Sequence, residues 1–340
     1  MKQKLFTRRR WLLFGLVVLA VVLGPYIASR IASSSRRVSL HELEPSAEQE
    51  ATGLSGATSS GSLRVLCYNI AHGRGVVKSN WDGGNAAERA VRLDEIAAQL
   101  REIGADIVVL NEVDFQSSWS GSENQARTLA RLAGYKYWAE QRNLDFRVLG
   151  WTWCFGNAVL SNYPIDNAEV VDLPEYSPWE TWSAGKKRGV ACEIRIDARR
   201  KVQLVGVHLS HRSEALRIRS AEMLIDMAKE SRYPLIVVGD LNSTPPDLPK
   251  AAFDEAGNNA MATFDKASQL QRIPISLPLT ENDMTFHSSK PSRVIDWILI
   301  PPNWRFDEYQ VIHSPLSDHR AVCADVSAGE VNSQASESPK

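Results

Sequence analysis

The fold is decided by the stretch Leu235-Ile-Val-Val-Gly-Asp240-Leu-Asn242-Ser-Thr-Pro-Pro246. Its aliphatic run predicts a short strand that is buried on both faces. Gly239 lets the backbone turn, and the two prolines end the strand soon afterwards. Asp240 and Asn242 therefore follow a core strand, and in an extended segment their side chains point to the same side. Such a pair suits a water molecule, a metal ion or a phosphoryl oxygen, whereas a simple Asx-type turn is the alternative interpretation.

Other predicted strands also carry polar groups at or near their ends. Strands are expected at residues 63–68, 106–110, 156–161, 188–196, 201–207, 293–300 and 320–326. The polar residues in or beside them are Asn69, Glu112, Asn157, His208, Asp296, Asp318 and His319. A buried carboxylate costs several kcal/mol unless it is paired or bound to a cation, although a single one is usually a satisfied structural residue. If these groups converge, their carboxylates require a cation, and an oxygen-rich set suits Mg²⁺ or Mn²⁺ better than zinc.

Helical periodicity is found at residues 86–103, 123–132 and 212–229, and a further helix is expected near residues 247–255. Strands outnumber helices, and neighbouring strands often look linked as hairpins. This arrangement is typical of an α+β protein in which helices flank the sheets, rather than a strict βαβ alternation.

The N-terminal segment does not belong to the folded domain. Basic residues up to Arg10 precede residues 11–28, which carry no charge. This pattern predicts a membrane anchor or a signal segment over residues 1–28, with the basic end in the cytoplasm. We favour an uncleaved anchor that leaves the catalytic domain outside the cytoplasm, while cleavage at the small residues that follow would give a secreted protein.

The rest of the chain divides by composition. Residues 29–62 are rich in Ser, Ala, Glu and Gly and predict a flexible linker, residues 63–327 predict the folded domain, and residues 328–340 predict a flexible tail. The folded domain holds 30 Lys and Arg against 34 Asp and Glu, so it has no general basic field for a nucleic acid. Four cysteines lie in apolar segments without the spacing of a zinc site. This pattern favours small buried side chains over a disulfide framework, and a single disulfide bond is the alternative.

The ordered set of motifs resembles a known superfamily. The motifs are Leu66-Cys-Tyr-Asn69, Val109-Leu-Asn-Glu112, Gly156-Asn157, Val207-His208-Leu, Gly239-Asp240-Leu-Asn242, Ile295-Asp296-Trp-Ile and Ser317-Asp318-His319-Arg. In this order they resemble the endonuclease/exonuclease/phosphatase superfamily over nearly all of residues 63–327. The resemblance implies a four-layer α/β/β/α sandwich of two mixed sheets flanked by helices, with the site at one end.

The resemblance also implies roles for matching residues. Glu112 would be the principal metal ligand, with Asn69 and Asp318 completing the metal or phosphate shell. Asp240 and Asn242 would orient or deprotonate the attacking water, and His319, paired with Asp296, would bind the phosphate. His208 would be a phosphate contact or general acid, Asn157 would bind substrate, and the identity of the general base stays open. Arg188 lies outside the matching motifs, and we expect it to bind substrate from its place beside Lys187.

The substrate is less well defined by the sequence. Trp151, Trp153, Trp179 and Trp182 lie near Lys186, Lys187 and Arg188, and they predict either a rim that grips bases or a headgroup, or packing under long loops. We expect a monomeric Mg²⁺- or Mn²⁺-dependent phosphodiesterase acting on an extracytoplasmic phosphoester, either a nucleic acid or a lipid or small-molecule headgroup. A nuclease of the same superfamily is the alternative, and a catalytically silent binding module is a third class.

Overall fold

The polar strand ends are carried by two packed sheets. The computed structural model describes residues 2–31, 33–43, 61–179, 181, 185–273 and 280–329. The first sheet has seven strands in the spatial order β1 (Val38–Glu42), β4 (Tyr137–Val148), β5 (Trp151–Ser161), β3 (Ile107–Asp114), β2 (Leu63–Asn69), β12 (Ala321–Ala328) and β11 (Trp304–Ile312). The second has five, in the order β10 (Asp296–Leu299), β9 (Leu235–Asp240), β8 (Lys201–His208), β7 (Gly189–Arg195) and β6 (Ile165–Val171).

Each sheet contains one parallel pair at its centre. β2 runs parallel to β3, and β8 runs parallel to β9, whereas the other paired strands are antiparallel. The carboxyl ends of each parallel pair therefore meet at one edge of the sheet. These are the ends that carry Asn69, Glu112, His208 and Asp240.

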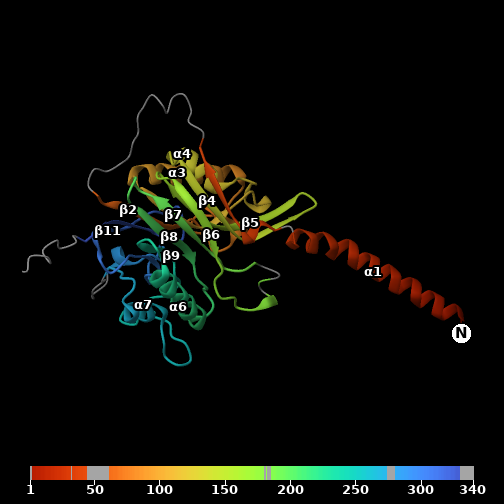
Figure 1. Cartoon of the computed structure of the whole chain (residues 1–340). Helices are drawn as coiled ribbons and strands as arrows, with labels where there is room; N and C mark the ends of the chain where they lie inside the picture. Colours follow the sequence, from red (N-terminus) through yellow and green to blue (C-terminus); the bar gives the residue numbers. More distant parts are fainter. Residues whose placement is uncertain are drawn as a thin grey trace, which may run out of the picture.

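Helices cover the outer face of both sheets (Figure 1). Helices α3 (Ala86–Ile103) and α4 (Gln125–Ala133) pack on the seven-stranded sheet through residues such as Leu93 and Leu129. Helices α6 (Glu214–Glu230) and α7 (Ala260–Ala267) pack on the five-stranded sheet, where Leu224 and Phe264 are buried. Short 3₁₀ turns lie at Ser34–Arg36, Ala71–Gly73, Asn80–Asp82, Ser118–Ser120 and Glu281–Asp283.

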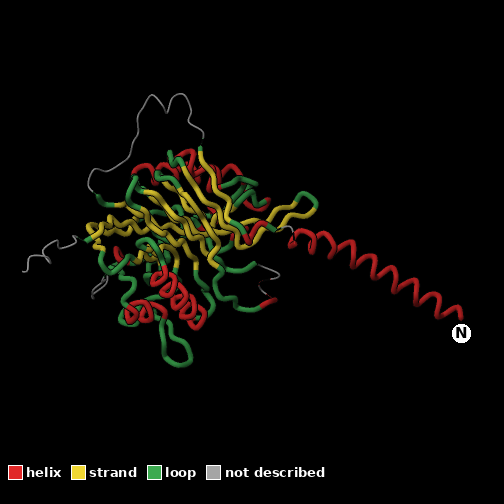
Figure 2. Tube along the Cα trace, in the orientation of Figure 1, coloured by secondary structure: helices red, strands yellow, loops and turns green. Residues whose placement is uncertain are grey.

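The inner faces of the two sheets bury a third apolar cluster between them. Val65 and Val109 of one sheet meet Leu204, Val238 and Ile298 of the other, and all are fully or almost fully buried. The order of layers is helix, sheet, sheet, helix, as the tube in Figure 2 shows. The expected α+β four-layer α/β/β/α sandwich of two mixed sheets is confirmed.

Two local expectations differ from the structure. Residues 247–255 form turns, not a helix, and the helix α7 begins at Ala260 instead. Pro245, Pro246 and Pro249 lie around the start of the expected helix at residue 247 and cannot donate helical hydrogen bonds, whereas Asn259 caps α7 by accepting from the Ala262 amide.

The range expected as a linker also contains regular structure. Residues 38–42 form β1, the edge strand of the seven-stranded sheet, which pairs with β4 from Val38–Gln141 to Glu42–Tyr137. The linker prediction is therefore wrong for this part, because backbone pairing along a sheet edge needs no long apolar pattern. Residues 44–60 of that range, and residues 330–340 of the expected tail, lie outside the described residues.

Helix α1 (Lys2–Ile31) extends away from the sandwich (Figure 1). Its segment Arg9–Ile31 is long and apolar enough to cross a membrane, and none of its apolar window is buried in the protein. A signal sequence would pass the same test, so the helix alone does not decide between the two.

Candidate active site

Asp240, at the end of β9, is the centre of a group of polar side chains from both sheets. Asn69 Nδ2 donates to Asp240 Oδ2 at 3.2 Å. His208 Nε2 lies 3.4 Å and His319 Nε2 lies 3.7 Å from the same oxygen. All four residues are at least nine-tenths buried. The structure therefore brings four of the predicted site residues into direct contact.

His319 is held by a second carboxylate, that of Asp296 at the start of β10. Its Nδ1 lies 2.9 Å from Asp296 Oδ2, and Asp296 is fully buried. Burial acts to lower the pKa of His319, but the Asp296 and Asp240 carboxylates outweigh it and raise that pKa above its ordinary value. Burial, with Asp296 adding to it, raises the pKa of Asp240, while His319 opposes the change.

Asn111 connects the two sheets behind this group. Its Oδ1 accepts from the Asp240 amide at 2.9 Å, and its Nδ2 donates to the Val207 carbonyl at 3.0 Å and to Asn157 Oδ1 at 2.8 Å. Asn157 Nδ2 in turn donates to Gln141 Oε1 at 2.8 Å. Asn157 is thus fully engaged with protein groups and fixes Asn111, and through it Asp240. Its predicted contact with substrate stays a prediction.

Glu112 occupies an irregular position in β3. The pairing of β3 with β5 shifts between Asn111 and Val113, and Glu112 between them has a φ of 53°. Such a bulge turns one side chain out of the regular alternation, and left-handed backbone in a residue other than glycine is typical of functional sites. The Glu112 side chain keeps 25% of its surface exposed.

Basic side chains surround the Glu112 carboxylate. Arg74 Nη1 donates to Glu112 Oε2 at 3.1 Å, and His72 Nε2 lies 3.4 Å from that oxygen. Burial acts to raise the pKa of Glu112, but His72, His208, Lys187 and Arg74 outweigh it and hold that pKa well below its usual range. The carboxylate is therefore ionised and available as a ligand.

Arg74 also contacts the second predicted acidic metal ligand. Its Nη2 donates to Asp318 Oδ2 at 2.6 Å, so one guanidinium joins Glu112 and Asp318. Ser317, the neighbour of Asp318, is held by its hydroxyl, which donates to the Asn69 carbonyl at 2.6 Å. The two carboxylates thus lie on either side of one position, which the Arg74 guanidinium occupies.

The remaining predicted residues lie close by. Asn242 has a φ of 50°, its amide donates to Asp240 Oδ1 at 2.9 Å, and its side chain donates to the Leu209 carbonyl at 3.2 Å. Arg188 instead pairs with Asp172 at 3.2 Å and donates to the Asn143 carbonyl at 3.3 Å. Its role as a substrate contact stays a prediction.

This geometry agrees with a family comparison. The family model of the endonuclease/exonuclease/phosphatase family matches residues 66–319, which contain every residue of the group. The chain belongs to the endonuclease/exonuclease/phosphatase family. This family includes phosphatases, phosphodiesterases and nucleases, which are hydrolases of phosphoester bonds that depend on divalent metal ions.

Known proteins extend the comparison. The protein YbhP of Escherichia coli K12 is 26% identical over 274 residues, which cover 78% of this chain and 96% of YbhP. An endonuclease/exonuclease/phosphatase of Bacteroides vulgatus shares the fold with a TM-score of 0.58 and 19% identity, over 78% of this chain and 99% of its own. The mannosyl-6-phosphatase Bt3783 of Bacteroides thetaiotaomicron does so with a TM-score of 0.55 and 16% identity, over 78% and 99%.

The donor set fits the divalent ion that the endonuclease/exonuclease/phosphatase family uses. Glu112 and Asp318 already share one cation, the Arg74 guanidinium, so their charges suit a hard metal ion. A second combination, Asp240, Asp296 and His319, has ligand atoms within 4.8 Å of one another. In that combination both Asp296 oxygens already contact His319 Nδ1, which favours Glu112 and Asp318 as the metal ligands.

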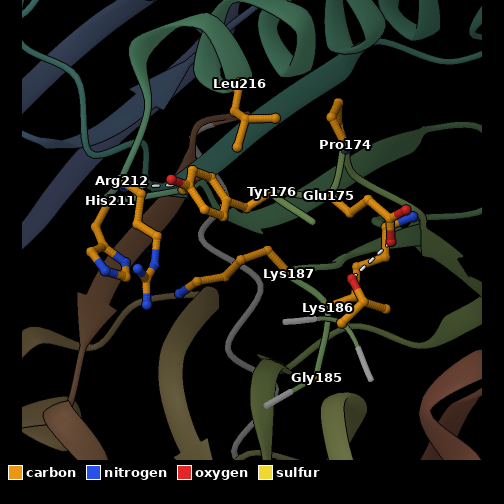
Figure 3. Close-up of a pocket in the computed structure, with 11 residues that line it drawn as sticks. Pro174, Glu175, Tyr176, Gly185, Lys186, Lys187, His211, Arg212 and Leu216 are labelled. Atoms are coloured by element: carbon orange, nitrogen blue, oxygen red, sulfur yellow. Dashed lines mark hydrogen bonds between the residues drawn. The ribbon is translucent and has the colours of Figure 1, made fainter. Parts of the chain in front are cut away.

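A hollow lies beside His208 of this family member. It has an empty volume of about 370 Å³, and its lining includes Tyr176, Lys187, His211 and Arg212. Lys187 Nζ is 3.0 Å from both ring nitrogens of His208, and burial together with this ammonium holds the pKa of His208 well below its usual value. Figure 3 shows the nitrogen atoms of Lys187, His211 and Arg212 gathered on one side, with Glu175 on the opposite side.

Sequence reasoning missed His72 and Arg74 of the endonuclease/exonuclease/phosphatase site. Both belong to the loop directly after β2, where His72 Nδ1 also contacts Asp114 at 2.9 Å. They lie three and five residues after Asn69, and that closeness to a predicted ligand was the available signal. No apolar strand surrounds them, so the search for polar strand ends did not reach them.

Proposed function

We propose that the chain is a Mg²⁺- or Mn²⁺-dependent phosphodiesterase that acts outside the cytoplasm. The observation that carries the proposal is the meeting of two groups at one edge of the sandwich. One is Asp240 with His319 and Asp296, and the other is Glu112 with Asp318. A histidine held by a carboxylate, a second buried carboxylate and a pair of metal ligands are the parts that hydrolysis of a phosphodiester needs.

The residues divide the reaction between them. Glu112 and Asp318, with Asn69, would hold the metal ion, which when bound neutralises phosphate charge and favours ionisation of water. Asp240 and Asn242 orient the attacking water, Asp240 accepts its proton, and the cationic His319 binds a phosphoryl oxygen. Water oxygen bonds to phosphorus, the ester P–O bond breaks, and the departing oxygen takes a proton from water. His208, which its lowered pKa keeps neutral, would contact the phosphoryl group.

The hollow beside His208 supports a substrate with an additional anionic group. Lys187, His211 and Arg212 line it, and Arg212 lies 5.5 Å from the Tyr176 ring centre. Basic side chains on one wall attract a phosphate or carboxylate that lies beyond the scissile bond. A charged headgroup and a nucleotide both have this chemistry, so the hollow does not separate lipid from nucleic acid.

A substrate panel tests the proposed function. The full-length protein in detergent is assayed with Mn²⁺ on bis-p-nitrophenyl phosphate, on phospholipid vesicles and on supercoiled plasmid. We expect release of p-nitrophenol that EDTA abolishes, and headgroup release from vesicles without nicking of the plasmid. Nicking with no headgroup release would establish the nuclease alternative. Failure on all three substrates would leave a silent binding module and overturn the proposal.

A further inference from the structure

The hairpin between β4 and β5 ends in a set of exposed apolar side chains. Leu149 is 94% exposed, Trp151 is 57% exposed and Trp153 is 48% exposed. Trp151 and Trp153 alternate along one strand and so share a face. Large apolar side chains gathered at one protruding tip are costly in water and mark a contact surface.

The turn itself departs from what local structure favours. Its two residues, Leu149 and Gly150, have φ values of 49° and 84°. Asparagine, aspartate or glycine is favoured at both central positions of such a two-residue turn. A left-handed leucine is strained, and its side chain, which is 94% exposed, gains almost no packing on the described residues to offset this. The leucine is therefore better explained by a contact outside the domain.

The hairpin contacts the end of the apolar helix α1. The rings of Tyr26 in α1 and Phe146 in β4 are 5.0 Å apart between their centres. The Arg147 amide donates to the Ser29 hydroxyl at 2.7 Å. Figure 1 shows the β4–β5 hairpin reaching the domain end of α1. The tip thus lies beside the last turns of the segment that is long and apolar enough to span a bilayer.

The hairpin also extends from the edge that carries the active site. Glu112 lies near the carboxyl end of β3, and Asp114 at that end is paired with Phe155 of β5. Trp151, the first residue of β5, lies four residues before Phe155. That separation is about 13 Å at the usual rise of a strand, so the tip extends past the end of β3. The apolar tip and the site therefore face the same way.

From these observations we propose that Leu149, Trp151 and Trp153 insert into the surface of the bilayer from which α1 emerges, and that they turn the active site toward lipid headgroups. Tryptophan beside a spanning helix is favoured at the membrane interface, where its ring is partly apolar and partly polar. The substrate class that follows is a phosphoester at the membrane surface, and this second part rests on the proposed hydrolase function.

Fluorescent labelling tests the insertion without using activity. A Leu149→Cys protein, full-length and reconstituted in phosphatidylcholine vesicles, is labelled with an NBD probe, since the four native cysteines are all buried. A matched label at Phe253→Cys, a residue 51% exposed in the segment before α7, is the control. We expect blue-shifted NBD emission that nitroxide-labelled lipids quench at position 149, and water-like, unquenched emission at position 253. Water-like emission at position 149, or a blue shift that lipid nitroxides do not quench, overturns the proposal.

A second variant separates insertion from catalysis. The changes Leu149→Asn, Trp151→Thr and Trp153→Thr suit the turn and the strand, so the hairpin should still form. We expect unchanged hydrolysis of bis-p-nitrophenyl phosphate and about a tenfold loss of headgroup release from vesicles, equivalent to a few apolar contacts with lipid. Equal rates on vesicles would refute the orienting role. Inactivity of the unaltered protein on both substrates would refute the hydrolase function, while the NBD result would still decide insertion.

Discussion

Glu140 and Glu112 are two carboxylates on the same seven-stranded sheet with opposite surroundings. Glu140 is 1% exposed and accepts hydrogen bonds from Asn124 at 2.9 Å, Trp138 at 3.1 Å and Arg142 at 2.6 Å. The Glu112 side chain is 25% exposed, lies on a bulge with left-handed backbone, and depends on Arg74 and His72. Both carboxylates have a lowered pKa, so charge alone does not distinguish them.

The difference lies in what each carboxylate gives to the protein. The Glu140 carboxylate has hydrogen-bond donors from the protein on both oxygens. It also links β4 to β1, because His41 Nε2 of β1 lies 3.5 Å from it. Glu112 has a left-handed backbone, which costs stability, and a partly exposed side chain, which leaves room for a ligand. A structural carboxylate has all its partners within the fold, whereas a functional one is complete only when something else binds.

The largest effect that tests this contrast is expected at Glu112. We predict that Glu112→Gln lowers turnover on bis-p-nitrophenyl phosphate by about 10³-fold. The metal ion loses a charged ligand, and the charge that develops in the transition state is then stabilised less well. Thermal unfolding should change little, since Gln keeps the shape. Turnover is measured at saturating Mn²⁺, and normal metal-dependent activity would end the assignment of Glu112 as a ligand.

A smaller loss of activity is expected at Asp296. Asp296→Asn removes the charge that favours protonated His319, and we predict about a 10²-fold fall in turnover. The pKa of His319 should fall as well, since the Asp296 carboxylate is the largest influence that raises it. NMR titration of the His319 ring checks this, and an unchanged pKa would assign the raised value to Asp240 alone.

Glu140 should show the converse behaviour. We predict that Glu140→Gln costs about 2 kcal/mol of unfolding free energy near neutral pH, because a charge-assisted bond to Arg142 is lost, while turnover stays normal. Burial acts to raise the pKa of Glu140, but its bonds to His41 and Asn124 and the charge of Arg142 outweigh it and lower that pKa to about 2.

The pH dependence of this effect has a definite sign. A lowered pKa contributes stability above the unfolded value of 4.5, and that contribution is lost as the pH falls toward 2. The stability difference between the native protein and Glu140→Gln, measured by urea unfolding, should therefore shrink over that range. A difference that stays constant from pH 7 to pH 3 would contradict the ionic role of Glu140.

The smallest effect is expected at Arg74. Because its guanidinium occupies the position between Glu112 and Asp318, a metal ion bound by both must displace it. We predict that Arg74→Ala binds Mn²⁺ about tenfold more tightly in calorimetric titration, whereas Arg74→Lys, which keeps the charge, changes affinity less. Weaker binding by Arg74→Ala would instead show that the arginine supports the metal site or that the metal binds elsewhere.

The polar strand ends were predictable because a carboxylate or amide among aliphatic residues stands out in a linear sequence. Asp240, Asp296 and His208 were found in this way, and the structure joins them through Asn69 and His319. The order of the motifs also predicted the sandwich. Neither argument depends on knowing which strands are neighbours.

What the sequence did not reveal depends on pairing. β4 was not expected as a strand, since it buries polar residues such as Gln141 and Asn143 that satisfy each other and hide the alternation. The bulge that redirects Glu112 is visible only in the register between β3 and β5. β1 and the contact of Arg74 with Asp318 likewise join residues that are distant along the chain.

The pairing of β1 with β4 sets the length of chain between helix and domain. Only residues 32–37 separate the end of α1 from the start of β1, and six fully extended residues reach about 20 Å. If α1 is retained as an anchor, this short tether keeps the catalytic domain at the membrane surface. The domain then meets substrate by diffusion within the bilayer plane and not by diffusion through solution. Its turnover should then follow the number of substrate molecules per unit of bilayer surface, and diluting the vesicles at fixed lipid composition should leave it unchanged.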